Sequence, residues 1–133
     1  MTYKSEWWSI ELPSQWRGYP DGDCETFRAD PALGILQISA ACKETGNITE
    51  DDLKEFAHAR VAPDAPLEKV KFGTFSGFTT RYRKNELAWQ EWWLGLNALM
   101  VYVTYNVVHG SELAARDTIA GILASLRSAS TIK

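Results

Sequence analysis

Aromatic side chains in the second half of the sequence are the residues whose type and spacing could do chemistry. The chain has six tryptophans in 133 residues, and Trp89, Trp92 and Trp93 share one short segment with Glu91. Indole and phenol rings bury a large apolar area at low entropic cost and keep one hydrogen-bonding group. A surface that mixes such rings with a few polar groups is therefore suited to recognition.

A predicted hairpin gathers these rings on one face. The segments Phe78–Lys84 and Leu87–Leu94 read as strands, and Asn85 and Glu86 between them suit a two-residue turn. Because successive strand side chains point to opposite faces, the pairing across this turn sorts them into two sets. One face then carries Phe78, Thr80, Tyr82, Trp89, Glu91 and Trp93.

A third strand, Ala98–Val108, extends this face after a turn around Leu96. Pairing of Gly95 with Ala98 would place Met100 beside Trp93, and a slip of one residue would move the whole last strand to the other face. The candidate binding residues of the combined face are Tyr82, Trp89, Glu91, Trp93, Tyr102 and Thr104.

The opposite face of the same three strands is the more hydrophobic one, with Trp92, Leu94, Leu99, Val101, Val103 and Tyr105. We expect this face to form the main core. The aromatic face has two interpretations: it is an open binding surface, or the first of two predicted helices covers it as a second, smaller core.

These features support more than one function. The leading hypothesis is a non-catalytic protein-binding or assembly factor of the chaperone, adaptor or immunity type, with another protein as partner. The alternative is a small-ligand-binding protein or minor enzyme with an enclosed pocket around Glu91, a carboxylate whose pKa burial would raise. A third possibility is a structural subunit, monomeric or weakly dimeric through an edge strand at Lys69–Phe72.

Recognised catalytic and cofactor motifs are not found in the sequence. It has no Gly-rich phosphate loop, no nucleophile elbow and no His-x-x-x-His pair, so we expect no catalytic residues, no metal and no cofactor. A thiol–imidazole pair of His58 with Cys42, or of His109 with Cys24, stays open. We expect both cysteines to be reduced and to lie on opposite faces of the sheet.

Composition sets the remaining limits. A chain of 133 residues with 45% hydrophobic and 23% charged residues fits a single domain over 1–133. The net charge of -3 disfavours a nucleic-acid partner, and the basic residues around Tyr82 fit a solvated turn. With no apolar run of membrane-spanning length and no signal-peptide pattern, we expect no membrane insertion and a cytoplasmic location.

The remaining segments indicate an α+β fold. Glu6–Leu12, Cys24–Arg28, Gly34–Cys42 and Glu68–Phe72 read as strands, and Ser14–Asp23 reads as a loop. One helix begins at Thr49, with Asp52 completing a capping box and Leu53, Phe56 and Ala57 on its apolar stripe. A final helix, capped by Ser111, carries Ile119, Ile122, Leu123 and Leu126. The prediction is an antiparallel sheet of about six to seven strands flanked by two helices.

Several short motifs in this order resemble the PsbP-like α/β/α sandwich superfamily. They are Leu12-Pro13-x-x-Trp16, Gly34-Ile35-Leu36-Gln37-Ile38-Ser39, Asp52-Leu53, Gly77-Phe78 and Ile122-Leu123-x-Ser125-Leu126. The superfamily includes the extrinsic oxygen-evolving subunit of photosystem II, Ran-binding import factors, DcrB lipoproteins and chaperones of type VI secretion effectors. The resemblance implies a binding or assembly role and no shared catalytic residues. The sequence departs from the exported members, since it lacks a lipobox cysteine and a transit segment.

Overall fold

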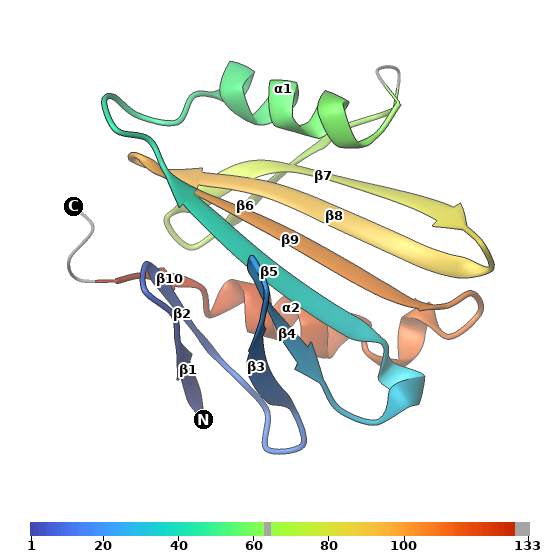
Figure 1. Ribbon diagram of the computed structural model, residues 1–133. Helices are drawn as coiled ribbons and strands as arrows, with labels where there is room; N and C mark the ends of the chain where they lie inside the picture. Colours follow the sequence, from blue (N-terminus) through green and yellow to red (C-terminus); the bar gives the residue numbers. More distant parts are fainter. Residues whose placement is uncertain (63–64, 130–133) are drawn as a thin grey trace.

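A seven-stranded antiparallel sheet forms the centre of the computed structural model, which describes residues 1–62 and 65–129 (Figure 1). The strand order is β3-β4-β5-β9-β8-β7-β6. The strands are β3 (Arg17–Asp21), β4 (Cys24–Arg28), β5 (Ile35–Cys42), β6 (Glu68–Phe72), β7 (Phe75–Lys84), β8 (Leu87–Leu96) and β9 (Leu99–Val108).

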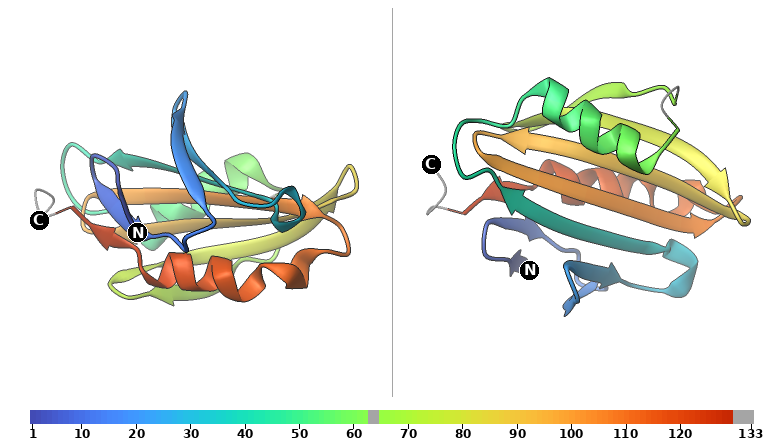
Figure 2. Two further views of the ribbon diagram at one scale, coloured as in Figure 1. Left: turned by 90° about the horizontal axis from the view of Figure 1, so that it is seen from below. Right: turned by 45° about the horizontal axis from the view of Figure 1, so that its top comes forward.

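One helix lies on each face of this sheet. Helix α1 (Glu50–Arg60) packs on β7 and β8 on what we call the front face. Helix α2 (Arg116–Ala124) lies on the back face beside a three-stranded sheet of β1 (Thr2–Lys4), β2 (Trp8–Glu11) and β10 (Arg127–Ser128) (Figure 2). Short 3₁₀ turns, Pro31–Leu33 and Glu112–Ala114, complete the elements. The predicted α+β architecture, a sheet between two helices, is confirmed.

Three sequence-based predictions about the elements were wrong. The Ser14–Asp23 segment contains strand β3, which pairs with β4 at the edge of the sheet, where Pro20 is tolerated. The Glu6–Leu12 strand belongs to the separate three-stranded sheet, because it pairs with the N-terminus and with β10. Ser111 begins a 3₁₀ turn without a side-chain cap, and α2 starts only after Ala115.

The two turns of the β7–β8–β9 meander fix which side chains share a face. Asn85 and Glu86 have φ of 54° and 65°, the left-handed values of a two-residue hairpin turn, as predicted. At the second turn Leu96 pairs with Leu99, so the predicted pairing of Gly95 with Ala98 was wrong by two residues. Because strand side chains repeat with a period of two, the faces are preserved and only the partners change.

Two cores of different size lie on the two faces. The back core joins the sheet to α2 and the small sheet through residues such as Trp8, Trp16, Trp92, Val103 and Ile122. The front core is small and consists of Leu53, Ala57, Phe78, Trp93 and Met100. Helix α1 starts with the predicted capping box of Thr49 and Asp52. Its Phe56, predicted on the buried stripe, is 48% exposed, because the helix seats only Leu53 and Ala57 on the sheet.

Candidate functional site

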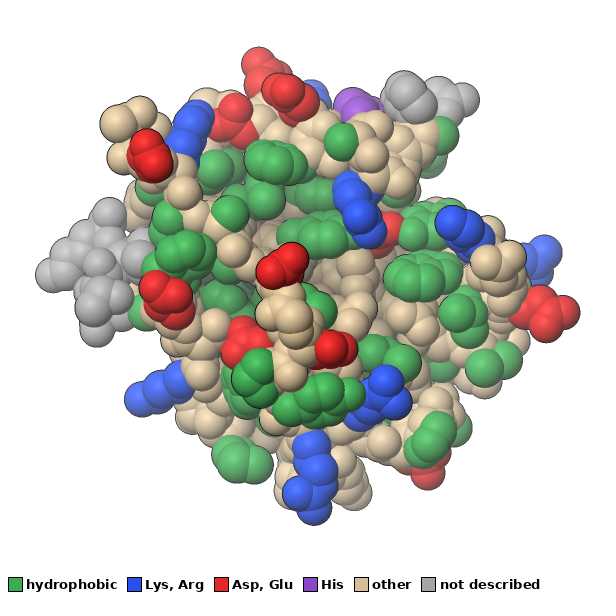
Figure 3. All heavy atoms as spheres, viewed as in Figure 1, with side chains coloured by type: hydrophobic (Ala, Val, Ile, Leu, Met, Phe, Trp, Pro, Cys, Tyr) green, Lys and Arg blue, Asp and Glu red, His purple; other side chains and the backbone are tan. Residues whose placement is uncertain are grey.

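An elongated trough runs along the front face beside α1, over central strands of the sheet. Three adjoining hollows of about 450, 180 and 190 Å³ form it. Its floor comes from β5, β9 and one end of β8, and one wall comes from α1. The β3–β4 hairpin projects forward from the sheet on the other side, as Figures 1 and 2 show. We call this depression the front trough; Figure 3 views the molecule from this side.

One end of the front trough is apolar. Phe56 and Ala59 of α1 face Ala41 of β5 and Met100 of β9 across it. Helical spacing places Phe56 and Ala59 on one side of α1, beside the stripe that Leu53 and Ala57 bury in the sheet. The half-exposed Phe56 ring therefore lies in a depression and not on a flat surface.

The other end carries the predicted aromatic residues. The Tyr82 and Trp89 rings, paired across β7 and β8, are nearly parallel, with centroids 6.1 Å apart. Trp93 stacks on Tyr102 at 5.8 Å. Trp89, Tyr102 and Thr104 line the hollow of about 190 Å³ at this end, beside α1's last residue, Arg60. Tyr82, Trp89 and Tyr102 are only partly buried.

A buried carboxylate holds these rings in place. Glu91 is 2% exposed, and its two oxygens accept hydrogen bonds from the hydroxyls of Tyr82 and Tyr102. Arg60 donates from Nε to the Tyr102 hydroxyl at 2.9 Å and lies 4.0 Å from Glu91 Oε1. Its guanidinium also sits over the Tyr102 ring, 5.2 Å from the centroid. A buried charge is tolerated where its lone pairs are satisfied in this way.

The tyrosines act as hydrogen-bond donors at every physiological pH. Burial, followed by the hydrogen bond to the Glu91 carboxylate, raises the pKa of both Tyr82 and Tyr102 well above the ordinary value. Both hydroxyls therefore keep their protons. The Tyr82–Glu91–Tyr102 network fixes ring orientation, and it presents no free acid or base to the trough.

The structure places the six predicted residues on one face but not on one surface. Trp93 is 1% exposed beneath α1, so its predicted role in an exposed binding surface was wrong: the helix covers it. Thr104 is buried except where it meets the trough, and Glu91 lies beneath the tyrosines. Neither Glu91 nor Tyr82 lines any of the trough's hollows. The two interpretations of the aromatic face, an open binding surface and a core covered by a helix, each apply to part of it. Helix α1 covers the end with Phe78 and Trp93 and leaves the end with Trp89 open.

Sequence reasoning missed several residues of the trough. Arg60 was not singled out by the sequence, and Gln37 and Ser39 appeared only within a predicted strand. Their position on the floor follows from the pairing of β5 with β9, which joins Gln37 to Thr104 across a long chain separation. The signal that was available is the alternation in β5, which puts Gln37, Ser39 and Ala41 on the face opposite Leu36 and Ile38.

The other candidate chemistries do not assemble. His109 contacts Arg83 and Glu112, and the Cys24 thiol donates to the Asp21 carbonyl, so this imidazole and thiol do not pair. Neither histidine hydrogen-bonds to a cysteine within 1–62 and 65–129, where both thiols are free. The described residues contain no cluster of three or more metal-ligating side chains.

Neither helix of the described chain has the length and apolarity that crossing a bilayer requires.

Comparison with known proteins identifies the fold. No family model matches the sequence, and no curated protein matches it. Among solved structures, a protein from Bacteroides thetaiotaomicron superposes with a TM-score of 0.71 at 19% identity, over 96% of this chain. This chain spans 47%, about half, of that protein's length.

The second similar structure is cyanobacterial PsbP from Synechocystis. It superposes with a TM-score of 0.52 at 7% identity, over 97% of this chain and 92% of its own. The class of the protein is therefore an α/β/α sandwich with an antiparallel sheet. Within that class, the predicted PsbP-like fold is confirmed. At these identities the likeness concerns the fold alone, and function must be argued from the site.

Proposed function

We propose that this chain is a non-catalytic binding or assembly protein that holds a segment of another protein in the front trough. One observation carries the proposal: α1 leaves the Trp89 end of the aromatic face uncovered, and a buried network fixes its rings. Tryptophan and tyrosine anchors in pre-formed positions supply much of the energy of protein recognition, because little side-chain entropy is lost on binding.

The polar groups of the trough favour binding over bond-making. Both oxygens of Glu91 are already occupied by tyrosine hydroxyls. A general acid or base must reach the proton it transfers, and Glu91 lies beneath the tyrosines and Arg60. Lys43, the basic group at the other end, is paired with Asp52 at 2.9 Å.

The shape of the trough favours an extended chain over a compact metabolite. The hollow beside Trp89 holds about 190 Å³, and the hollow at the apolar end holds about 450 Å³. Only the second is within the roughly 300–1,000 Å³ typical of small-molecule sites, and it lies away from the aromatic end. The hollow beside Trp89 continues through the middle hollow into the apolar end around Phe56 and Met100. A partner segment with one residue against Trp89 and an apolar residue against Phe56 would use both ends.

The test compares two exposed apolar positions. A photo-reactive phenylalanine analogue is placed at Phe56, which is 48% exposed in the trough, or at Leu113, which is 73% exposed outside it. After cross-linking in cells, we expect one partner to be captured from position 56 and not from position 113. Adding Trp89→Ala should weaken that capture at least tenfold while the far-ultraviolet spectrum stays unchanged.

Other outcomes would count against the proposal. Equal capture from both positions, no capture, or capture that ignores Trp89→Ala would remove the trough as the binding surface. The alternative of a small-ligand protein or enzyme predicts instead that a metabolite raises the melting temperature and that Trp89→Ala abolishes the rise. Dimerisation through β6, an edge strand of the main sheet, predicts a sedimentation coefficient that rises with protein concentration.

A further inference from the structure

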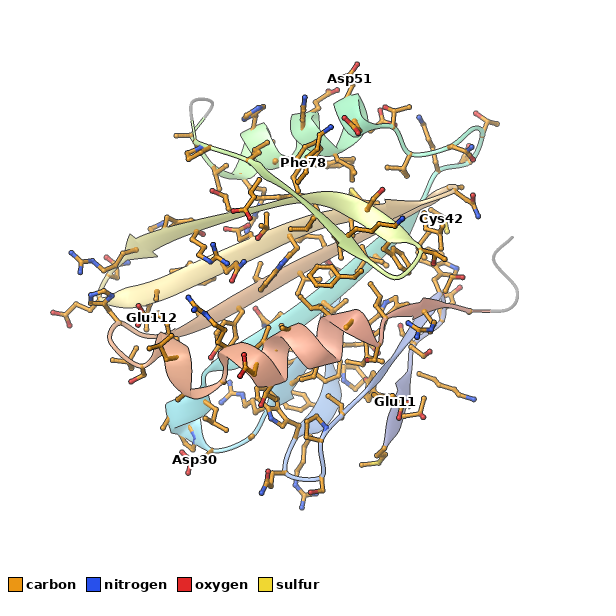
Figure 4. The ribbon with its side chains drawn as sticks, turned by 180° about the vertical axis from the view of Figure 1, so that it is seen from behind. Glu11, Asp30, Cys42, Asp51, Phe78 and Glu112 are labelled. Carbon is orange, nitrogen blue, oxygen red and sulfur yellow. The ribbon has the colours of Figure 1, made fainter. Side chains whose placement is uncertain are left out.

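A second hollow lies on the back face, and Trp89 is the one lining residue that it shares with the front trough. It has a volume of about 660 Å³ and lies between α2 and strands β6, β7 and β8. Figure 4 shows the molecule from this side, with α2 crossing in front of the sheet and Glu112 beside the helix's first turn. This volume is within the roughly 300–1,000 Å³ range of small-molecule sites. We call this hollow the back groove.

Strand register gives the back groove an apolar end and a cationic end. Val70 and Phe72 line one end, where they pair with Gly77 and Phe75 at the start of β7. Further along β7, Arg81 and Arg83 point to the same face as Phe75, because side chains two apart share a face. Arg116, the first residue of α2, joins them.

The floor between these ends is largely apolar. Trp92, Tyr105 and Val107 line it from the sheet, and Ile119 and Leu123 line it from α2. Trp92, Val107 and Leu123 are among the buried residues of the back core, so this floor is the edge of a packed surface. An apolar group that lay on it would remove hydrophobic area from water at both the sheet and the helix.

The charges of the three arginines are not neutralised by a carboxylate among the residues that the structure describes. Within the described part of the chain, none of their guanidinium groups forms a salt bridge with an aspartate or glutamate. Arg83 bonds the His109 ring at 2.8 Å. The two acids of the groove are Glu68 and Glu112, and Glu112 already accepts from the Gly110 N–H and lies 3.6 Å from His109.

We propose that the back groove binds an amphiphilic organic anion, with its carboxylate or phosphate head at the three arginines and its apolar body over the floor. Guanidinium groups bind such heads through paired charge-assisted hydrogen bonds. The apolar body adds the contact area that a simple inorganic anion lacks. The arginines and the apolar floor line none of the hollows of the front trough, so the proposal does not rest on a protein partner there.

The experiment uses decanoate as the probe, below its micelle-forming concentration, with the full chain. Calorimetric titration should show saturable binding at least tenfold tighter than binding of decanol, and none of acetate at the same concentrations. Decyl phosphate distinguishes the two head groups. In nuclear magnetic resonance spectra, the Trp92 indole N–H should shift and the methyl group of Met100, which lies in the front trough, should not.

Matched variants locate the site. Replacing Arg81, Arg83 and Arg116 together by glutamine should weaken decanoate at least tenfold and leave decanol unchanged. The control replaces Arg17 and Arg28, both exposed on the β3–β4 hairpin, by glutamine and should bind as the unmodified chain does. Ala120→Trp, at an exposed position of α2 that lines the groove, should block both probes by filling it.

The proposal is overturned if decanoate fails to saturate the protein, if decanol binds as tightly, or if the triple variant retains full affinity. Melting temperatures of all variants are measured first. If the triple variant does not fold, the single arginine variants and Ala120→Trp decide the question by the same criteria.

Discussion

Removing the Glu91 carboxylate tests whether the tyrosine network holds the aromatic end of the trough in place. Each of its oxygens accepts one phenolic hydrogen bond, and hydrogen bonds to a charged group contribute about 1.5–3 kcal/mol each. Arg60 is exposed and 4.0 Å away, so its ion pair adds about 0–1 kcal/mol. We therefore expect Glu91→Ala to lower the free energy of unfolding by about 3–5 kcal/mol, as for other buried charge pairs that lose one partner.

A double-mutant cycle separates the network from simple packing. The Tyr82 hydroxyl bonds only to Glu91 among the described residues, so Tyr82→Phe should cost about 1.5–3 kcal/mol in the native background. In the Glu91→Ala background its cost should fall by at least about 1 kcal/mol, because the acceptor is already gone. Unfolding is followed in urea by circular dichroism, with equal m-values required across the four proteins.

An exposed carboxylate on α1 provides the control for Glu91→Ala. Glu55→Ala removes an exposed carboxylate from α1 and should change stability by no more than about 0.5 kcal/mol. If Glu91→Ala costs less than about 1 kcal/mol, or if Tyr82→Phe costs the same in both backgrounds, the network does not hold the rings and our account of the site is wrong.

Three further outcomes follow from burial and geometry. Trp93→Ala should lower the free energy of unfolding, measured in urea, by about 3–5 kcal/mol. Trp89→Ala, at the edge of the trough, should lower it by less than about 2 kcal/mol. Similar losses for the two variants would contradict the burial of Trp93 and the exposure of Trp89. Above pH 10 the protein should lose stability. The pKa of both tyrosines bonded to Glu91 is raised in the folded state, so the unfolded chain releases these protons first. The variant with phenylalanine at both positions should lose less stability over the same pH range. Gly77→Ala should destabilise the chain strongly, since the new Cβ would lie 1.8 Å from the Trp93 carbonyl oxygen. Gly121→Ala, in open space on α2, should stabilise the chain by about 0.5–1 kcal/mol. Melting temperatures of the two variants check both predictions.

The sequence predicted the two faces of the meander correctly because alternation survives an error of two residues in register. The turn at Asn85 and Glu86 was placed correctly, and the next turn was not, yet Trp92 and Trp93 still lie on the expected opposite faces. The neighbours were wrong: Trp93 pairs with Tyr102 and not with Met100. Which residues stack on which therefore depends on turn geometry that local sequence does not fix.

Other parts of the site could not be predicted because they depend on long-range pairing. The β3 strand carries Pro20 and Gly18, which disfavour a strand, and forms because β4 offers a partner at the sheet edge. The role of Arg60 requires that α1 end directly above Tyr102, 42 residues further along the chain. No local pattern contains that information.

The open half of the front face follows from element lengths that the sequence does contain. Helix α1 has 11 residues and is therefore about 16 Å long, whereas β8, with 10 residues, is about 33 Å long. A helix of that length covers about half of such a strand, so α1 seals Trp93 and leaves Trp89 open. Helix α2, with 9 residues, is shorter still, but it begins at Arg116 beside the arginine end of β7, so the back groove lies alongside this helix. The open end of the front trough thus arises from a mismatch between a short helix and long strands, which makes element length the first quantity to compare when looking for sites in a sandwich of this kind.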